Sequence, residues 1–295
     1  LATVAVREAL TEAGVSLDGT PLDDVGLVMN TILGPSAAVE AYLERLQEKG
    51  PRASRPALFV DTLLSMPASR VGIALRLRGS TAVLGGSSPF ELALDWVQRG
   101  REQAVVAGGS EYHSPKCLRY FRALTERSGA ERPRLAQAAA FVVVEDAEHA
   151  QKRGAAPLAE LLGAGAASEP QEVALPWGAD PEGRAFASAM RGALVDAEVG
   201  LEAVEWVALA AEDDASEAGE LAALRAVFGD RFGSLTLLWP KRLLGEALGA
   251  SAGLGLLAAL AHLENDARDQ PAVAMVNAFE MGGGVTSLVL QVPPS

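Results

Sequence analysis

Hydrophobic residues in this sequence fall into short Val-rich runs and longer Ala/Leu segments with a helical period. The short runs, each bounded by Gly or Asp, predict strands at 25–29, 104–107, 139–144, 206–209, 272–276 and 287–291. The longer segments predict helices near 3–13, 37–48, 89–99, 183–197, 217–228 and 247–264. Continuous apolar strands separated by helices are typical of sheets covered on both faces, so the pattern predicts the α/β class.

The chain also repeats itself. Arg7-Glu-Ala-Leu-Thr-Glu-Ala13 precedes the predicted strand at 25–29, and Arg191-Gly-Ala-Leu-Val-Asp-Ala197 precedes the one at 206–209. Both copies read as a helix, a short polar link and a buried strand. We therefore predict two related halves, 1–150 and 151–295. Chance similarity between two Ala-rich helices is the alternative.

Composition indicates a large buried core and excludes several kinds of site. The chain is 49% hydrophobic and 21% charged, which excludes intrinsic disorder. Its net charge of −13 opposes binding to phosphate backbones, so we expect no nucleic-acid partner. The single Cys117 excludes a disulfide framework and a Cys-rich metal site, and the three histidines are far apart. We expect no metal and no cofactor.

No segment reads as a membrane span or a secretory signal. The most apolar run, 247–263, is rich in Ala and Gly and is bounded by Glu246 and Glu264, which predicts a buried core helix. The first residues carry charges at helical spacing. We therefore expect a cytoplasmic protein with no membrane partner.

Four motifs, in order, resemble those of the β-ketoacyl synthases. The stretch from 59 to Gly79 is similar in spacing, as is Ala107-Gly-Gly109 followed by Ser114-Pro115. Further on, Lys241-Arg-Leu-Leu-Gly-Glu-Ala-Leu-Gly-Ala-Ser-Ala-Gly253 resembles the family's Lys-x-x-x-Gly-His-x-x-Gly-Ala-Ala-Gly element. Asn277-Ala-Phe-Glu-Met-Gly-Gly283 resembles its Asn-Ser-Phe-Gly-Phe-Gly-Gly turn. The fold implied is thiolase-like, with two duplicated halves in five layers, α/β/α/β/α. The family's first strand has no counterpart before the helix at 3–13.

The resemblance also implies three catalytic groups, and the sequence departs from all of them. The family's nucleophilic Cys, at a helix N-terminus, aligns with Ser88, or with Ser87 after a shift of one residue. Its first His falls near Ala210. Its second His aligns with Glu246, a carboxylate that would repel an enolate, while Lys241 is kept. We therefore assign no catalytic residue and expect no independent condensing activity.

The alternative for Ser87 and Ser88 is structural. Either serine before Pro89, with Glu91 in the first turn, fits a helix N-cap and a capping box. We favour the cap over a nucleophile, because the positions implied by the resemblance offer Glu246 and Lys241 as possible bases but no histidine to take a proton from the hydroxyl. The histidines at 113, 149 and 262 are expected to be structural.

The function implied is that of a catalytically degenerate synthase subunit resembling a chain-length factor. Such a subunit pairs with an active ketosynthase and shapes the acyl-chain cavity in polyketide, polyene or fatty-acid-type biosynthesis. It meets acyl carrier protein only indirectly, through its partner. Residues 80–84 would form the strand that crosses the dimer. The expected interface and cavity residues, each of which could equally be core, are Phe59, Leu63, Met66, Phe279 and Met281. The alternative function is a serine-dependent acyltransferase or thioester hydrolase on the same fold.

Overall fold

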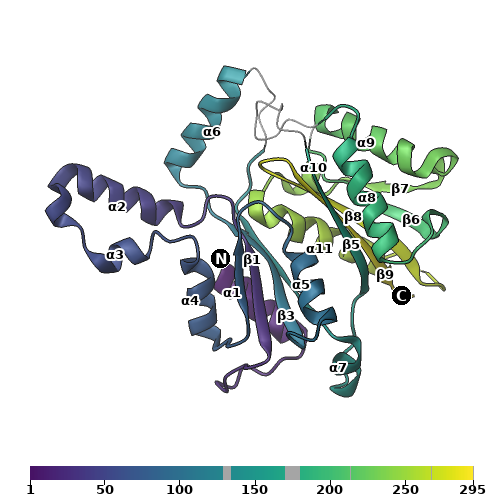
Figure 1. The fold of residues 1–295 in the computed structure, drawn as a ribbon, viewed down its shortest axis with the longest axis horizontal. Helices are drawn as coiled ribbons and strands as arrows, with labels where there is room; N and C mark the ends of the chain where they lie inside the picture. The colour runs from purple at the N-terminus through teal and green to yellow at the C-terminus, as the bar shows by residue number, and fades with distance from the viewer. Residues whose placement is uncertain (129–133, 170–179, 213, 267, 295) are drawn as a thin grey trace.

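The computed structural model describes residues 1–128, 134–169, 180–212, 214–266 and 268–294, and contains two β-sheets (Figure 1). The first sheet has the order β2-β1-β3-β4. Its central strand β1 runs parallel to β2 and β3, and β4 closes the sheet antiparallel to β3. The bounds are β1 (Val25–Asn30), β2 (Thr81–Leu84), β3 (Ala104–Glu111) and β4 (Ala138–Glu145).

The second sheet has the order β5-β9-β8-β6-β7. β6 is parallel to β7 and β8, whereas β9 is antiparallel to both β8 and β5. The bounds are β5 (Glu160–Ser168), β6 (Val204–Ala208), β7 (Thr236–Leu238), β8 (Ala272–Glu280) and β9 (Gly284–Val292). The boundary that we propose between the halves, after residue 150, falls in helix α7 (Ala147–Lys152), which lies between the two sets of strands in sequence.

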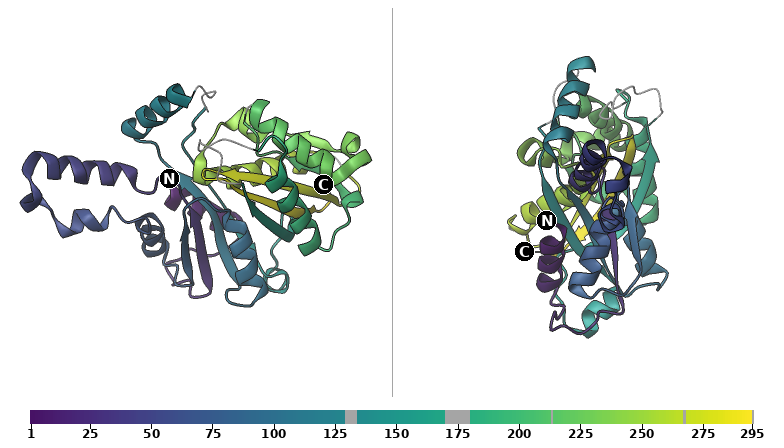
Figure 2. Two further views of the ribbon diagram at one scale, coloured as in Figure 1. Left: turned by 45° about the horizontal axis from the view of Figure 1, so that its top comes forward. Right: turned by 90° about the vertical axis from the view of Figure 1, so that its left-hand side faces the viewer.

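Helices cover both faces of each sheet and produce five layers (Figure 2). α5 (Pro89–Gln98) and α11 (Ser251–Glu264) lie between the sheets. α1 (Ala2–Glu12) and α4 (Met66–Leu75) cover the outer face of the first sheet. α8 (Arg184–Asp196) and α9 (Asp214–Phe228) cover the outer face of the second. The arrangement is α/β/α/β/α, as expected from the sequence.

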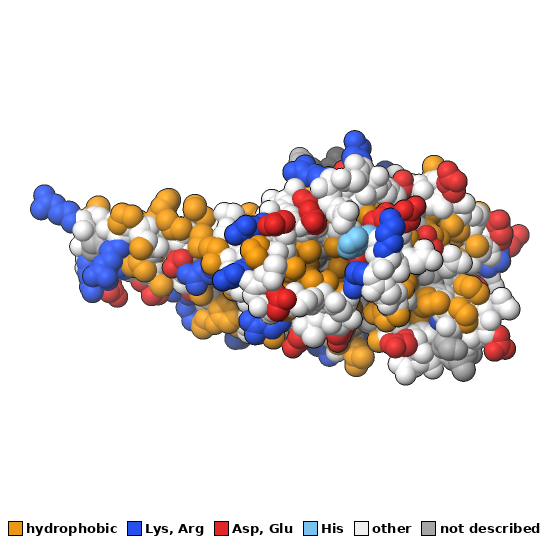
Figure 3. Space-filling view, turned by 90° about the horizontal axis from the view of Figure 1, so that it is seen from below, with side chains coloured by type: hydrophobic (Ala, Val, Ile, Leu, Met, Phe, Trp, Pro, Cys, Tyr) orange, Lys and Arg blue, Asp and Glu red, His pale blue; other side chains and the backbone are white. Residues whose placement is uncertain are grey.

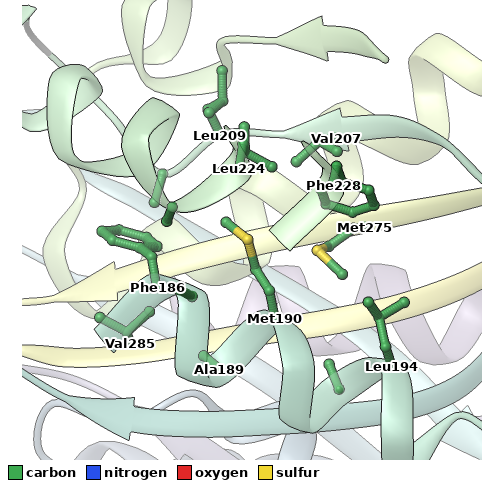
Figure 4. Close-up of a cluster of buried hydrophobic side chains, with 14 of the residues drawn as sticks. Phe186, Ala189, Met190, Leu194, Val207, Leu209, Leu224, Phe228, Met275 and Val285 are labelled. Carbon is green, nitrogen blue, oxygen red and sulfur yellow. The ribbon is translucent and has the colours of Figure 1, made fainter. Parts of the chain in front are cut away.

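Each interlayer space holds a cluster of buried apolar side chains. In the central cluster, Phe90 and Trp96 of α5 and Leu256 of α11 pack between the two sheets. Outside the second sheet, Phe186 and Met190 of α8 meet side chains from β6, α9, β8 and β9 (Figure 4). Burial of these side chains on both faces explains why the strands read as continuous apolar runs.

The remaining helices lie away from the layers. α2 (Ser36–Lys49), a 3₁₀ turn (Pro51–Ala53) and α3 (Pro56–Val60) form an extension at the left of Figure 1, which we call the arm. α6 (Pro115–Ser128) also projects from the body. α10 (Pro240–Leu244) precedes a 3₁₀ turn (Leu248–Ala250) that leads into α11. Further 3₁₀ turns are Leu201–Ala203 and Gly229–Ser234.

Strand β5 was missed by the hydrophobic pattern. Its sequence, Glu-Leu-Leu-Gly-Ala-Gly-Ala-Ala-Ser, lacks β-branched residues. The structure gives the reason: a Cβ on Gly163 would crowd the Ala197 backbone, and one on Gly165 would overlap the carbonyl of Ala189. Glycine is required at both positions so that α8 can approach the sheet. In the described ranges, no helix is both long and apolar enough to cross a bilayer.

Candidate functional site

Buried polar groups gather at the carboxyl ends of three strands. Asn30 ends β1, Glu111 ends β3 and Glu280 ends β8, and all three side chains are at most 1% exposed. The carboxyl ends of parallel strands are where α/β sheets form sites. The turn 85–88, which leads into α5, adjoins this position because Gly86 N donates a 3.1 Å hydrogen bond to Asn30 Oδ1.

Lys241 and Glu246 form a buried ion pair within this region. Lys241 Nζ lies 2.6 Å from Glu246 Oε2, and the two side chains are 8% and 4% exposed. The other oxygen, Glu246 Oε1, accepts hydrogen bonds from Leu248 N and Ser251 Oγ, each at 2.6 Å. Burial by itself lowers the Lys241 pKa, but the Glu246 carboxylate and other nearby acids outweigh burial, so this pKa lies above its ordinary value. Lys241 is therefore a charged, fully engaged group.

Glu280 is the most perturbed carboxyl in the region. Burial raises its pKa to about 8; Lys241 opposes the shift, and Glu246 adds to it. The Asn30 amide lies close enough to lower this pKa, yet its geometry falls short of a hydrogen bond. Among the described residues, Asn30 Nδ2 and both Glu280 oxygens therefore lack hydrogen-bond partners. At neutral pH, Glu280 holds a proton.

Glu111 joins the two halves through backbone amides. Its carboxylate accepts hydrogen bonds from Ile32 N at 2.7 Å, Leu33 N at 3.2 Å and Gly249 N at 3.2 Å. Burial raises its pKa, and these amide donors oppose the shift. The side chain thus satisfies donors from the first half and from the turn before α11.

Ala210 lies where the resemblance expects the first histidine, and a buried glutamate holds its backbone. Glu220 on α9 accepts hydrogen bonds from Ala210 N at 3.0 Å and Ala211 N at 2.9 Å. Asn277 Nδ2 donates to the same carboxyl at 2.8 Å. Burial raises the Glu220 pKa to about 7 despite these donors. The methyl side chain of Ala210 offers no proton donor or acceptor.

Ser88 occupies the N-cap position of α5, but its side chain does not cap the helix. Its backbone is extended and Pro89 follows at the first helical position, as the sequence predicted. The prediction of a capping hydrogen bond is wrong for Ser88, because its buried Oγ makes no hydrogen bond to the first turn of α5 or to any other residue that the structure describes. Ser87 is exposed. Among the described residues, no side chain forms a hydrogen bond with the Ser88 hydroxyl, so none is in place to take its proton.

The histidines and the cysteine have structural surroundings. His113 is buried, and its Nε2 lies 2.8 Å from the carbonyl of Ala136. His149 Nδ1 lies 2.5 Å from Glu145, and the His262 ring packs edge-on against Trp206. Cys117 is half-buried at the start of α6. In the described parts of the chain, no three His, Cys, Asp or Glu residues are grouped to hold a metal ion.

The five residues predicted to line an interface or cavity do not lie together. Phe59, on the arm, and Leu63, in the segment between the arm and α4, are about half exposed, and Met66 begins α4. Phe279 instead stacks on Phe186, with ring centroids 6.1 Å apart, as part of the core. The carbonyl of Met281 would lie 3.2 Å from a Cβ on Gly86, so that residue adjoins the turn before α5.

Sequence reasoning missed the acidic residues that organise the site. Glu111, Glu220 and Glu280 received no role, although each is almost fully buried. Glu280 carried the clearest signal, since it is a charged residue at the end of the largely apolar strand Ala272–Glu280 and stands at a Gly of the resembled motif. Glu111 carried a similar signal at the end of the strand Ala104–Glu111.

An open hollow elsewhere on the surface does not contribute to the site. It is lined by Gly72, Ile73, Arg76, Leu77 and Arg78. Leu77 bridges to Leu22, which precedes β1, so the hollow lies at the amino end of the first sheet, opposite the buried acids.

Comparison with solved structures agrees with this architecture. A type II polyketide synthase ketosynthase in complex with its acyl-carrier protein superposes with a TM-score of 0.85 over 98% of this chain and 83% of the other, at 19% identity. The ishigamide ketosynthase/chain length factor gives 0.82 over 98% and 80%, at 22% identity. A β-ketoacyl synthase from Burkholderia phymatum STM815 gives 0.79 over 98% and 81%, at 22% identity. The fold is thiolase-like.

Sequence comparison gives the family. The chain is 29% identical to 3-oxoacyl-[acyl-carrier-protein] synthase 2 of Coxiella burnetii over 85% of its own length and 65% of that protein's. It is 28% identical to Nodulation protein E of Rhizobium leguminosarum bv. trifolii, over 96% and 79%. The N-terminal domain of β-ketoacyl synthases matches residues 1–146, and their C-terminal domain matches 158–270. With two domains matched in order and the thiolase-like fold around them, the chain belongs to the β-ketoacyl synthase family.

Proposed function

We propose that this chain is a catalytically degenerate, chain-length-factor-like subunit that pairs with an active ketosynthase and shapes its acyl cavity in polyketide, polyene or fatty-acid-type biosynthesis. The observation that carries the proposal is the buried ion pair of Lys241 and Glu246, because the resemblance expects a histidine where Glu246 stands. A carboxylate offers only hydrogen-bond acceptors. It cannot stabilise the negative charge that develops during condensation.

The serine at the end of the turn supports the same reading. In the part of the chain that the structure describes, Ser88 Oγ has no hydrogen-bond partner, so no side chain there activates it as a nucleophile. Ala210 presents a methyl group where an imidazole would be needed. Both observations support a subunit without independent condensing activity. They also count against the alternative of a serine-dependent acyltransferase or thioester hydrolase.

An unpaired strand edge supports pairing with a second chain. β2 is the edge strand of the first sheet. The carbonyl of Ser80 accepts a hydrogen bond from Leu27 N of β1, and that of Leu84 accepts one from Thr31 N, directly after β1. Because backbone direction alternates along a strand, the polar groups of Val83 point away from β1. Such an edge is a template for a strand of another chain.

The arm and the segment 61–65 that joins it to α4 have apolar side chains exposed to solvent (Figure 3). α3 has no buried residue. Large apolar side chains that recur on one exposed segment indicate a protein interface. They precede β2 in sequence and lie on the same half as its free edge. The exposed residues are Leu43, Leu58, Phe59, Val60, Leu63 and Leu64.

The partner that we propose is a ketosynthase with an intact catalytic site. Two of the similar solved structures are described as a ketosynthase with its acyl-carrier protein and as a ketosynthase/chain length factor. Acyl carrier proteins are acidic, and the net charge of −13 on this chain opposes direct attraction. Acyl carrier protein would therefore dock on the partner. We place the complex in the cytoplasm.

Co-expression with a catalytically intact ketosynthase from the same organism tests the proposal. We expect stable one-to-one co-purification, and products whose chain length changes when this subunit is replaced by a relative. Recovery of this chain only as a self-associated dimer would overturn the pairing. A mass increase on Ser88 after incubation with acyl thioesters would instead favour the serine-dependent alternative.

A further inference from the structure

The position of Glu280 in the fold singles it out. Its side chain is 1% exposed, and neither oxygen has a hydrogen-bond partner among the described residues. A buried carboxyl without partners carries a large desolvation penalty and calls for an explanation. The ion pair of Lys241 and Glu246 does not use it, because that pair is complete on its own.

The side chain lies between Lys241 and the turn before α5. On one side, Lys241 Nζ reaches the carbonyl of Phe279, the residue before Glu280, at 3.4 Å. On the other side, Glu280 pairs with Gly284 in the register of β8 and β9. A Cβ on Gly284 would lie 3.7 Å from the Glu280 Cβ and 3.0 Å from the carbonyl oxygen of Gly86. Glu280 thus adjoins the turn that ends at Ser88.

Three buried polar groups without a full set of hydrogen-bond partners among the described residues belong to this region or to the turn that adjoins it. The Asn30 amide, the Ser88 hydroxyl and the Glu280 carboxyl are each more than nine-tenths buried, and each has an atom without a hydrogen-bond partner. Asn30 links the turn to Glu280, since its Oδ1 accepts a hydrogen bond from Gly86 N and its amide lies close enough to affect the Glu280 carboxyl. A protonated carboxyl has the planar shape of a thioester carbonyl group, with one oxygen in place of sulfur.

We propose that Glu280 is an internal occupant of the site: its carboxyl fills space beside the turn 85–88 that an acyl thioester would need. The chain thereby excludes acyl thioesters from its own half of any complex. The inference goes beyond the proposed function, because it concerns the site within this chain and holds whether or not a ketosynthase binds.

A thiol placed at Ser88 reports on this occupancy. In a Cys117→Ser background, Ser88→Cys carries the only thiol of the chain. With Glu280 present we expect iodoacetamide to alkylate this thiol no faster than the protein unfolds. Adding Glu280→Gly should accelerate alkylation at least tenfold in the folded protein. Glu280→Gln, of equal size, is the matched control and should stay protected.

Ligand binding gives an independent measurement. We expect the N-acetylcysteamine thioester of octanoic acid to bind saturably to Glu280→Gly in calorimetry, and not to the parent or to Glu280→Gln. Equal binding by the parent, or rapid alkylation with Glu280 present, would overturn the proposal. So would a folded glycine variant that neither binds the thioester nor exposes the thiol. Glu280→Ala replaces Glu280→Gly if the latter does not fold. If neither folds, protection of the thiol in the parent decides. Pairing with a ketosynthase is assayed separately, so the two proposals can fail independently.

Discussion

Lys241 and Glu246 are five residues apart in sequence and form a buried ion pair whose Nζ–Oε2 distance is 2.6 Å. Gly245 makes the return of the chain possible, since it adopts φ +85 and a Cβ there would press on the carbonyl of Arg134. The pair is further held by Ser251 Oγ at the start of α11. The positive φ of Gly245 and the carboxylate of Glu246 thus keep the charged Lys241 side chain inside the protein.

Removing one partner of this pair should be far worse than removing both. Glu246→Ala leaves a buried ammonium without its counter-charge, and we expect a loss of about 3–5 kcal/mol in the free energy of unfolding. The double variant Lys241→Met with Glu246→Leu should lose markedly less than the sum of the single changes. Urea denaturation in a double-mutant cycle measures this. Additive losses would show that the ion pair is not coupled.

The Glu280 carboxyl should make stability depend on pH in a defined direction. Its pKa is raised from 4.5 to about 8, so the unfolded chain releases this proton more easily than the folded one. The penalty is absent below pH 4.5, grows as pH rises towards 8 and is fully present above it, at about 1.4 kcal/mol per pH unit at most.

Glu280→Gln removes that titration. We expect the variant to gain stability relative to the parent between pH 5 and pH 8, measured by urea denaturation across the range. Glu48→Gln, on the exposed surface of α2, is the control and should follow the parent at every pH. Parallel curves for Glu280→Gln and the parent would contradict the buried, proton-holding state.

Glu220 should be essential for the loop that contains Ala210. Glu220→Ala leaves the buried N–H groups of Ala210 and Ala211 without acceptors, and each such loss costs about 1–3 kcal/mol. Thermal unfolding should therefore shift strongly downward. Glu205→Ala, on the exposed face of β6 in the same half, should leave it unchanged. Comparable shifts for the two variants would refute the assignment.

The contact between the halves at Gly109 should tolerate no side chain. A Cβ there would overlap the carbonyl of Gly249, in the turn before α11. We expect Gly109→Ala to destabilise the protein by about 3 kcal/mol or more, because backbone on both sides must move. Gly233→Ala, where a Cβ meets nothing within 4 Å, is the matched control. Differential scanning calorimetry compares the two.

The free edge of β2 offers a test of pairing that spares the fold. Val83 turns its N–H away from β1, so Val83→Pro should leave the isolated chain folded while removing a hydrogen bond from any strand added at this edge. We expect co-purification with the ketosynthase partner to fall at least tenfold, with unchanged circular dichroism. Val83→Thr should retain pairing. Undiminished pairing of the proline variant would place the interface elsewhere.

The sequence alone determined the layered α/β architecture and the position of most strands. A strand that is buried on both faces is a continuous apolar run, so it can be recognised from its own residues alone, as β1 and β3 show. Strand β5 has no such apolar run. Its glycines are needed because α8, which comes later in the sequence, packs closely against them. The spacing of the motifs also aligned Ser88, Lys241 and Glu246 with functional positions of the β-ketoacyl synthases.

Only the tertiary structure decided how the site is filled. Ser88 has the sequence of a cap but makes no capping hydrogen bond. The sequence showed Glu280 only as one position of a motif. In the fold, β8 and the turn at Gly86 bring its carboxyl close to Asn30. Whether a charged residue is solvated, paired or buried with a proton depends on the groups that surround it in space. Local pattern cannot report that environment, since its members come from strands and helices of both halves.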